Sequence, residues 1–453
     1  MTFFSIGQLL VLFVLQIVLA SLFGASEDLD VYMAVMAIPL VISAVLASSL
    51  SSVIIPLFNE LQEAHGDASV ETVLNRLGWI LLACGAGISS LLFLFARPVT
   101  GFLFPGFSES QILLGTEMLQ VLCWLVLLNT ATSFLFSVFH RRKRFFLPAL
   151  SGLVGPTVTV VLVVAFSVEG VRGIAWATLA GGVVGVLLLS LGFPRAGTSV
   201  NFPLRPVVKR FWIRLFPLVL GAAYYRLDPL VDRHLASSLT EGSISQLGYA
   251  WRLMSAVALI AVSGLSVVAF PAISRHAAAG DQQRFVSELA HAWRLLCVVL
   301  MPMIGGILCF STTLVSCLLE RGKFTAGDSE VVGGLMTLYA GLVLALGVGE
   351  ISARTFYALG NTWIPTLIGI LGFTIGAAAK FYWVKDYGIQ GLAVLTSGYF
   401  LLNAVLLLVI LRLRLKGPLF TGLGRTFGRS LVCSTVALGL AWLILDEASP
   451  IRA

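Results

Sequence analysis

The stretch Gly170-Val-Arg-Gly-Ile-Ala-Trp-Ala-Thr178 recurs in the second half of the chain as Gly388-Ile-Gln-Gly-Leu-Ala-Val-Leu-Thr396. The two copies share two Gly, one Ala and one Thr at the same spacing. Two further pairs recur in the same order and at nearly the same separation of about 216 residues: Leu50-Ser51-x-Val53-x-x-Pro56 with Leu265-Ser266-x-Val268-x-x-Pro271, and Pro148-x-x-x-Gly152 with Pro365-x-x-x-Gly369. One match could arise by chance in a chain rich in Gly and Leu. Three in order indicate an internal duplication.

The composition of the chain is that of a membrane protein. Of its 453 residues 58% are hydrophobic and 11% are charged, and the mean hydropathy is +0.98, whereas soluble domains carry roughly 25% charged residues. Apolar runs of about 20 residues, each long enough to cross about 30 Å of hydrocarbon, recur along the chain. An all-α polytopic protein of about thirteen transmembrane helices is therefore predicted, because unpaired backbone groups are costly in lipid. The predicted spans are 3–23, 32–58, 79–103, 112–139, 146–167, 171–193, 212–236, 246–272, 293–319, 331–358, 362–384, 388–411 and 428–445.

Basic residues predict the orientation of these helices. They gather in loops after even-numbered helices, as in Arg141-Arg-Lys-Arg144 and Arg412-Leu-Arg-Leu-Lys416, whereas the loop after the first helix contains Glu27-Asp28-Leu-Asp30. Since cytoplasmic loops are enriched in Lys and Arg, we expect a cytoplasmic N-terminus and a periplasmic Asp446-Glu447 tail. The net charge of +7 is therefore a topology signal and does not indicate a nucleic-acid partner.

The duplication predicts how the helices are grouped. Its shift spans six helices, an even number, so the two copies cross the membrane in the same direction as parallel repeats. We expect an N-terminal lobe at 1–193, a cytoplasmic linker at 194–211, a C-terminal lobe at 212–411, and a loop, an extra helix and a periplasmic tail at 412–453. Parallel repeats are typical of transporters with a central cavity that work by alternating access.

The sequence contains little that indicates catalysis. Its six cysteines lie in apolar segments without metal-ligand spacing, its five histidines are scattered, and no Walker-type phosphate loop occurs. We expect a transporter without a metal or cofactor. A membrane-embedded glycosyl- or acyltransferase would need a cluster of acidic residues or histidines, but the acidic residues of the expected loops 59–72 and 319–330 lack paired spacing. A non-transporting scaffold for envelope synthesis remains an alternative.

Several motifs in combination resemble the MviN/MurJ family of lipid II flippases. They lie in the stretches 235–253, 321–328 (Arg-Gly-Lys-Phe-Thr-Ala-Gly-Asp) and 353–362 (Ala-Arg-Thr-Phe-Tyr-Ala-Leu-Gly-Asn-Thr), with Leu22-Phe-Gly-Ala25, Asp30, Pro39, Pro56 and Arg144-Phe-x-x-Pro148-Ala149 upstream. The resemblance covers essentially the whole chain, although family members usually have fourteen helices. It implies a fold of the multidrug/oligosaccharidyl-lipid/polysaccharide exporter type. It also implies transport of an undecaprenyl-diphosphate-linked cell-wall precursor to the periplasmic leaflet of the bacterial inner membrane.

The chain departs from the family pattern where the family carries cavity cations in its first two helices. The matching positions are uncharged, at Leu9, Leu15, Ser21, Ala37 and Ser43, and Ser48 replaces a glutamate. The family's Asp-Arg pair reads Trp251-Arg252. Because arginines bind a diphosphate well, we expect the substrate-binding residues to be Arg252, Asp30 and Arg226. The cargo is then lipid II or another lipid-linked saccharide, and the implied partners are this substrate, membrane lipids and cell-wall synthesis proteins.

Charged residues inside membrane spans are candidates for function. One predicted helix carries Arg226, Asp228, Asp232 and Arg233, and the i, i+4 spacing puts both carboxylates on one face. Glu350 and Arg354 have the same spacing, which predicts a structural ion pair. We expect Asp228, Asp232, Lys380 and Thr396 to take part in coupling to the membrane potential or a monovalent cation.

Lys380 allows two interpretations. In the first, its ammonium is a built-in cation that pairs with Asp232 near Thr396, where cation-coupled relatives would hold a metal ion. In the second, the side chain snorkels to the outer interface beside Trp383 and Lys385.

Overall fold

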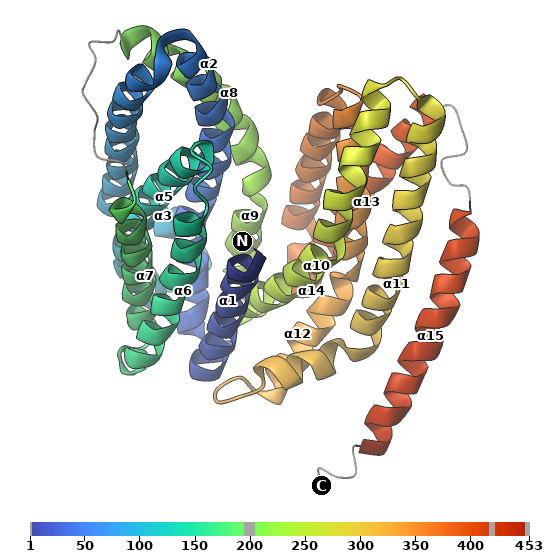
Figure 1. Cartoon of the computed structure of the whole chain (residues 1–453). Coiled ribbons are helices and arrows are strands. Elements are labelled where there is room, and N and C mark those ends of the chain that lie inside the picture. Colours follow the sequence, from blue (N-terminus) through green and yellow to red (C-terminus); the bar gives the residue numbers. More distant parts are fainter. Residues whose placement is uncertain (1, 194–203, 416–421, 449–453) are drawn as a thin grey trace. The chain divides into compact units, whose positions relative to one another are not determined.

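The computed structural model describes residues 2–193, 204–415 and 422–448, and within these ranges it contains helices and no strand (Figure 1). The helices of the first half are α1 (Thr2–Phe23), α2 (Glu27–Leu94), α3 (Ala96–Leu103), α4 (Glu109–Leu122), α5 (Trp124–Arg141), α6 (Phe146–Ala165), the short 3₁₀ helix η1 (Ser167–Glu169), α7 (Val171–Leu191), α8 (Leu204–Arg226) and α9 (Asp228–Ala236). Those of the second half are α10 (Ser243–Ala278), α11 (Gln282–Leu319), α12 (Ala326–Leu338), α13 (Ala340–Ala358), α14 (Trp363–Arg414) and α15 (Leu423–Ala448).

Two of these helices each consist of two limbs joined at a glycine. In α2 the non-helical residue is Gly66 (φ 77°, ψ 176°), and in α14 it is Gly388 (φ 54°, ψ −143°). Figure 1 shows the two limbs of α2 joined at one end of the first half. The prediction of a loop at 59–72 is wrong, because the helix continues on both sides of Gly66. The acidic residues of this stretch therefore lie on helices.

Four predicted spans are interrupted by breaks in the helix, and one of them is 79–103, which is divided at Phe95 between α2 and α3. The span 112–139 is divided at Cys123, 331–358 at Tyr339, and 212–236 at Leu227, immediately before Asp228-Pro229. Proline can begin a helix but lacks the N–H that the preceding turn would need, so a new helix starts at Asp228. The break at Leu227 places two of the predicted coupling residues, Asp228 and Asp232, in the short helix α9.

Ten helices of the described part of the chain are long and apolar enough to span a membrane. Each predicted span overlaps helical residues of the structure, but the count of thirteen stays a prediction. The prediction of a linker at 194–211 is partly wrong, because α8 already begins at Leu204. Residues 194–203 and 416–421 lie outside the described part.

The chain forms two compact units. The first comprises residues 1–245 and 321–325, and the second comprises 246–320 and 326–453. In the first unit, buried side chains of α2, α5 and α8 form a core that includes Phe58, Phe134, Val138, Phe211 and Leu215. Helices α8 and α9 thus belong to the first unit, whereas the predicted lobes assigned residues 212–236 to the second half.

The second unit is built on α11, α13 and α14. Helix α13 packs along α14, and α11 packs against α12 and α15. Gly305 of α11 gives α15 a close approach, because a Cβ there would meet Leu438 Cδ1 at 2.5 Å. Figure 1 shows α15 beside α11 at the edge of this unit.

A five-residue segment of the second half, 321–325, belongs to the first unit and contacts the turn after α1. The backbone N–H of Lys323 donates to the carbonyl of Ser21 at 2.9 Å. Gly24 (φ 63°) and Gly322 (φ 61°) have left-handed backbones, and a Cβ on Gly322 would lie 2.1 Å from the Ser21 oxygen. This close backbone approach explains the glycines in Leu22-Phe-Gly-Ala25 and Arg321-Gly-Lys-Phe324.

Candidate functional site

Asp30 joins the first turn of α2 to the first turn of α10. Its Oδ1 accepts hydrogen bonds from the backbone N–H of Ser245 at 2.7 Å and from the Ser245 hydroxyl at 2.5 Å. The Asp30 side chain is 5% exposed. The first N–H groups of a helix lack partners within it, so this carboxylate caps α10 from another helix. Such a contact supports a positioning role for Asp30.

Helix α9 is held at the same end of the first unit. The Arg233 guanidinium donates to the Met33 carbonyl of α2 at 2.9 Å and to the Pro229 carbonyl at 2.8 Å. His234 Nδ1 lies 2.7 Å from the Leu103 carbonyl of α3. Together, the contact of Asp30 with Ser245 and the contact of Arg233 with Met33 hold α10 and α9 at the start of α2.

The predicted charged residues around the break at Leu227 have different environments. Arg226 is exposed, Asp228 is buried, and Asp232 is half-buried. The two carboxylates are one helical turn apart on α9. The structure therefore places the acidic pair inside the first unit and the Arg226 side chain at its surface.

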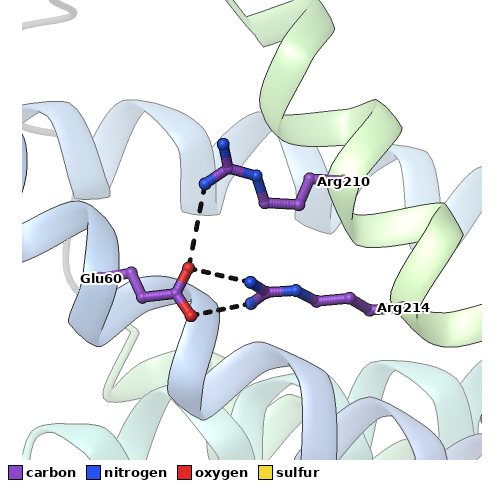
Figure 2. Close-up of polar contacts among 3 residues, drawn as sticks. All are labelled: Glu60, Arg210 and Arg214. Carbon is purple, nitrogen blue, oxygen red and sulfur yellow. Dashed lines mark hydrogen bonds and ion pairs between the residues drawn. The ribbon is translucent and has the colours of Figure 1, made fainter.

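The first limb of α2 holds α8 near Gly66, through an acidic residue that the sequence analysis did not single out. Figure 2 shows the carboxylate of Glu60 between two arginines of α8. Arg214 donates from both terminal nitrogens, with Nη1 to Oε1 at 2.9 Å and Nη2 to Oε2 at 3.1 Å, and Arg210 Nη1 lies 3.9 Å from Oε2. A bidentate pair of this kind fixes orientation as well as proximity.

Neighbouring residues extend this polar region to α5. The Arg141 guanidinium donates to Gln62 at 3.0 Å, and Arg142 forms an ion pair with Glu71 at 2.7 Å. The sequence contained a usable signal, since acidic residues between two spans face two basic segments. The sequence analysis interprets the basic segments only as markers of topology.

In the second unit the side chain of Lys380 is fully buried. Its exposed fraction is 0%, and Nζ lies 5.4 Å from the centroid of the Tyr399 ring, a distance at which a cation is attracted to the ring face. The snorkelling interpretation is wrong because the ammonium does not reach the surface. Thr396 is also fully buried, and its Oγ1 has no hydrogen-bond partner within the described residues. Asp232 belongs to the other unit, so its pairing with Lys380 stays a prediction.

The remaining predicted residues lie on α10 and α13. Arg252 is half-buried on α10, next to Trp251, whose ring meets Tyr339 edge-on at a centroid distance of 5.9 Å. Arg354 Nε lies 2.6 Å from Glu350 Oε1, and both side chains are partly exposed. Within the described ranges, no group of three His, Cys, Asp or Glu residues could hold a metal ion.

Comparisons with known proteins agree along the length of the chain. A family model described as lipid II flippase MurJ matches residues 19–450. The lipid II flippase MurJ of Burkholderia cenocepacia is 24% identical, covering 88% of this chain and 80% of that protein. The probable lipid II flippase MurJ of Helicobacter pylori strain J99 is 26% identical, covering 84% and 86%. The alignment with the probable lipid II flippase MurJ of Bdellovibrio bacteriovorus is 24% identical and spans 48% of that protein.

Solved structures agree on the fold. A lipid II flippase MurJ in an inward closed conformation matches with a TM-score of 0.83 and 20% identity, over 98% of this chain and 93% of that chain. An inward-facing MATE family transporter of the MOP superfamily matches with a TM-score of 0.74 and 16% identity, over 90% and 94%. At these identities the likeness establishes the fold alone, whereas the family model covers nearly all residues. The chain belongs to the lipid II flippase MurJ family.

Proposed function

We propose that this protein is a flippase that moves an undecaprenyl-diphosphate-linked cell-wall precursor from the cytoplasmic to the periplasmic leaflet by alternating access. Lipid II is the first candidate for the cargo, and another lipid-linked saccharide is the second. The observation that carries the proposal is the match of a lipid II flippase family model to residues 19–450. The protein is proposed to act as a transporter and not as an enzyme, in a multi-pass inner-membrane location with a cytoplasmic N-terminus.

The contacts of the broken helix support gating. Helix α2 holds α9 through the Arg233 contact with Met33, and it holds α8 through the Arg214 contact with Glu60. In the proposed orientation the first contact is periplasmic and the second is cytoplasmic. The Arg233 contact is a directional polar contact that can break and re-form, whereas α2 and α8 also share a packed core that includes Phe58 and Phe211. Alternating access requires such contacts to exchange between two states of the protein.

Arg252 is the proposed contact for the diphosphate. A guanidinium can donate two parallel hydrogen bonds to phosphate oxygens, and the half-buried Arg252 side chain lies at a depth where such bonds are strengthened by partial exclusion of water. Arg226 is exposed where helices α8 and α9 meet. We propose that it makes an earlier, weaker contact with the substrate.

Complementation would test the cargo. The protein would be expressed in a bacterium depleted of its own lipid II flippase, and growth and the amount of lipid II accessible to an added periplasmic enzyme would be measured. We expect rescue by the wild type, loss of rescue with Arg252→Gln, and partial rescue with Arg252→Lys. Arg97→Gln is the matched control, because Arg97 pairs with Glu109 at an exposed site of the first unit.

Two results would contradict the proposal in different ways. No rescue by a wild-type protein that is inserted in the membrane would exclude lipid II as the cargo and favour another lipid-linked saccharide or a scaffold. Rescue that is unaffected by Arg252→Gln would leave transport intact but remove Arg252 from the substrate site.

The buried ammonium of Lys380 supports a proposal on coupling. We propose that it replaces a bound monovalent cation, so that transport responds to the membrane potential without a requirement for sodium. A fully buried cation is costly unless the surroundings stabilise it, and the Tyr399 ring supplies one such contact. Lys380→Ala should reduce transport or create a dependence on sodium. Unchanged transport with no sodium dependence would contradict this proposal.

A further inference from the structure

A pocket of about 520 Å³ lies in the first unit, between the end of α2, the helix pair α4–α5, and α7. None of the predicted site residues lines it. Its wall includes two charged side chains, Glu117 and Arg172, the amide of Gln120, and the indole rings of Trp124 and Trp176. The proposed transport mechanism uses none of these groups.

The charges of this pocket form one pair that remains accessible to a ligand. Arg172 Nε lies 2.8 Å from Glu117 Oε2, and the two side chains are 61% and 56% exposed. This contact uses one of the five N–H groups of the guanidinium and one of the two carboxylate oxygens. A ligand that carries both an anion and a cation could therefore bind to both partners without breaking the pair.

An exposed apolar strip leads away from the charged pair along one face of α7. Trp176, Val183 and Leu187 follow Arg172 at helical spacing and are all exposed. Phe93, at the end of α2, lines the pocket and is exposed, and Leu94 next to it in sequence is also exposed. A strip of this kind suits an acyl chain, since it places hydrocarbon next to a charged group at one end.

Helices α5 and α7 also approach one another at Gly182, which does not line the pocket. At Gly182 the helix α7 comes close to α5, because a Cβ there would lie 3.1 Å from Leu128 Cδ1. Trp124 of α5 and Trp176 of α7 are part of the pocket wall. The pocket is thus an opening between two helices that are in contact further along α7.

The second copy of the duplicated sequence does not repeat this chemistry. The positions of Arg172 and Trp176 correspond to Gln390 and Val394. Tryptophans alone would be expected at a membrane interface without any specific ligand. Here two indole rings and an Arg–Glu pair line the same pocket. Since this combination is present in one copy only, it indicates a specific ligand.

We propose that this pocket binds the headgroup of a zwitterionic phospholipid of the phosphatidylethanolamine class. Arg172 binds the phosphate and Glu117 binds the ammonium, while the acyl chain follows Trp176, Val183 and Leu187. An anionic lipid such as phosphatidylglycerol offers no cation for Glu117 and fits less well. A free saccharide would leave the apolar strip uncovered.

Lipid binding to the purified full-length protein would test this inference. Short-chain phosphatidylethanolamine and phosphatidylglycerol would be titrated separately, and the bound lipid would be counted by native mass spectrometry. We expect the wild type to prefer phosphatidylethanolamine. Because one charge-assisted hydrogen bond is lost, Arg172→Gln should lower the affinity for both lipids about tenfold, which corresponds to about 1.4 kcal/mol. Glu117→Gln should lower the affinity for phosphatidylethanolamine by a similar factor and leave the affinity for phosphatidylglycerol unchanged.

The control is the neighbouring ion pair of Arg97 and Glu109, which has a similar exposure and does not line the pocket. Arg97→Gln should leave both affinities unchanged, and thermal unfolding of every variant would establish that it is folded. Equal binding by wild type, Arg172→Gln and Glu117→Gln would overturn the proposal, as would displacement of the lipid by soluble N-acetylglucosamine. Preference for phosphatidylglycerol would overturn the role of Glu117.

Discussion

In the first unit the stretch 170–178 begins α7, and in the second unit the stretch 388–396 begins the second limb of α14. Both start at a glycine with a left-handed backbone, with φ 68° and ψ −149° at Gly170 and φ 54° and ψ −143° at Gly388. Ala175 and Ala393 are both buried. The threonines differ, because Thr178 Oγ1 lies 3.1 Å from the Tyr32 hydroxyl, whereas Thr396 Oγ1 has no hydrogen-bond partner among the described residues.

Other matching positions differ in the same way. Phe134 and Val138 follow the break at Cys123 by the same number of residues as Glu350 and Arg354 follow the break at Tyr339. The first pair lies in the core of the first unit, and the second forms an ion pair. The duplication has therefore kept the backbone and changed the polar groups, so function is to be sought where the copies differ.

The largest effect is expected at the matching positions on α5 and α13. Phe134→Ala should lower the free energy of unfolding by about 3 kcal/mol, because it leaves a cavity in a packed core. Glu350→Gln should cost only about 0.5 kcal/mol, because the ion pair is partly exposed. Unfolding of the purified protein in mixed detergent micelles would measure both. Equal costs would mean that the two positions have the same structural role.

The starts of α2 and α10 differ in the source of their cap. In α2 the hydroxyl of Ser26 accepts from the Leu29 N–H at 3.4 Å. Gly242 precedes α10 and has no side chain, and Asp30 supplies the acceptor from another helix. Asp30→Ala should cost about 3 kcal/mol, since two buried donors lose a charged partner. Ser26→Ala should cost at most about 1 kcal/mol.

Asp30→Asn separates charge from hydrogen bonding. The amide oxygen can still accept from Ser245, so this variant should recover part of the stability lost in Asp30→Ala. The measurement is the same unfolding transition in detergent. If Asp30→Ala costs no more than Ser26→Ala, the contact between the starts of α2 and α10 does not stabilise the fold.

Alanine substitution of Gly170 and of Gly388, which both have left-handed backbones, should change the free energy of unfolding by similar amounts. No atom lies within 4 Å of a Cβ built on Gly170 or Gly388, so only the backbone conformation opposes an alanine there. Gly170→Ala and Gly388→Ala should each lower the unfolding free energy by about 1–2 kcal/mol. A thermal shift in one variant alone would show that the two turns are not equivalent. Gly349→Ala is the control, because this glycine also has open space for a Cβ and its φ is not left-handed.

The sequence predicted the helical spans well because apolar runs of membrane length have few alternative structures. It did not predict the breaks at Cys123 and Tyr339, because the spans 112–139 and 331–358 are apolar and contain no proline. Contacts between distant residues were also missed. Glu60 is one acidic residue among several in sequence, and only the position of α8 selects it as the partner of Arg214. For Lys380 the sequence left two interpretations open, and burial beside Tyr399 excludes snorkelling.

The smallest change in the free energy of unfolding is expected at Thr178 and Thr396. These two positions test the functional difference between the copies most directly. Thr178→Val removes the contact with Tyr32 and should cost about 1 kcal/mol, within the range of hydrogen bonds between membrane helices. Thr396→Val removes a buried hydroxyl that has no partner among the described residues, so its cost should be near zero.

Unfolding in detergent at low and high sodium would measure both threonine variants. A cost at Thr396 that equals the cost at Thr178 and does not depend on sodium would indicate a protein partner for Thr396 Oγ1. A cost that appears only in the presence of sodium would mean that this oxygen binds the ion. Lys380 would then lie near a cation site and would not replace it. The fully buried Thr396 therefore decides between a built-in and a bound cation in the second unit.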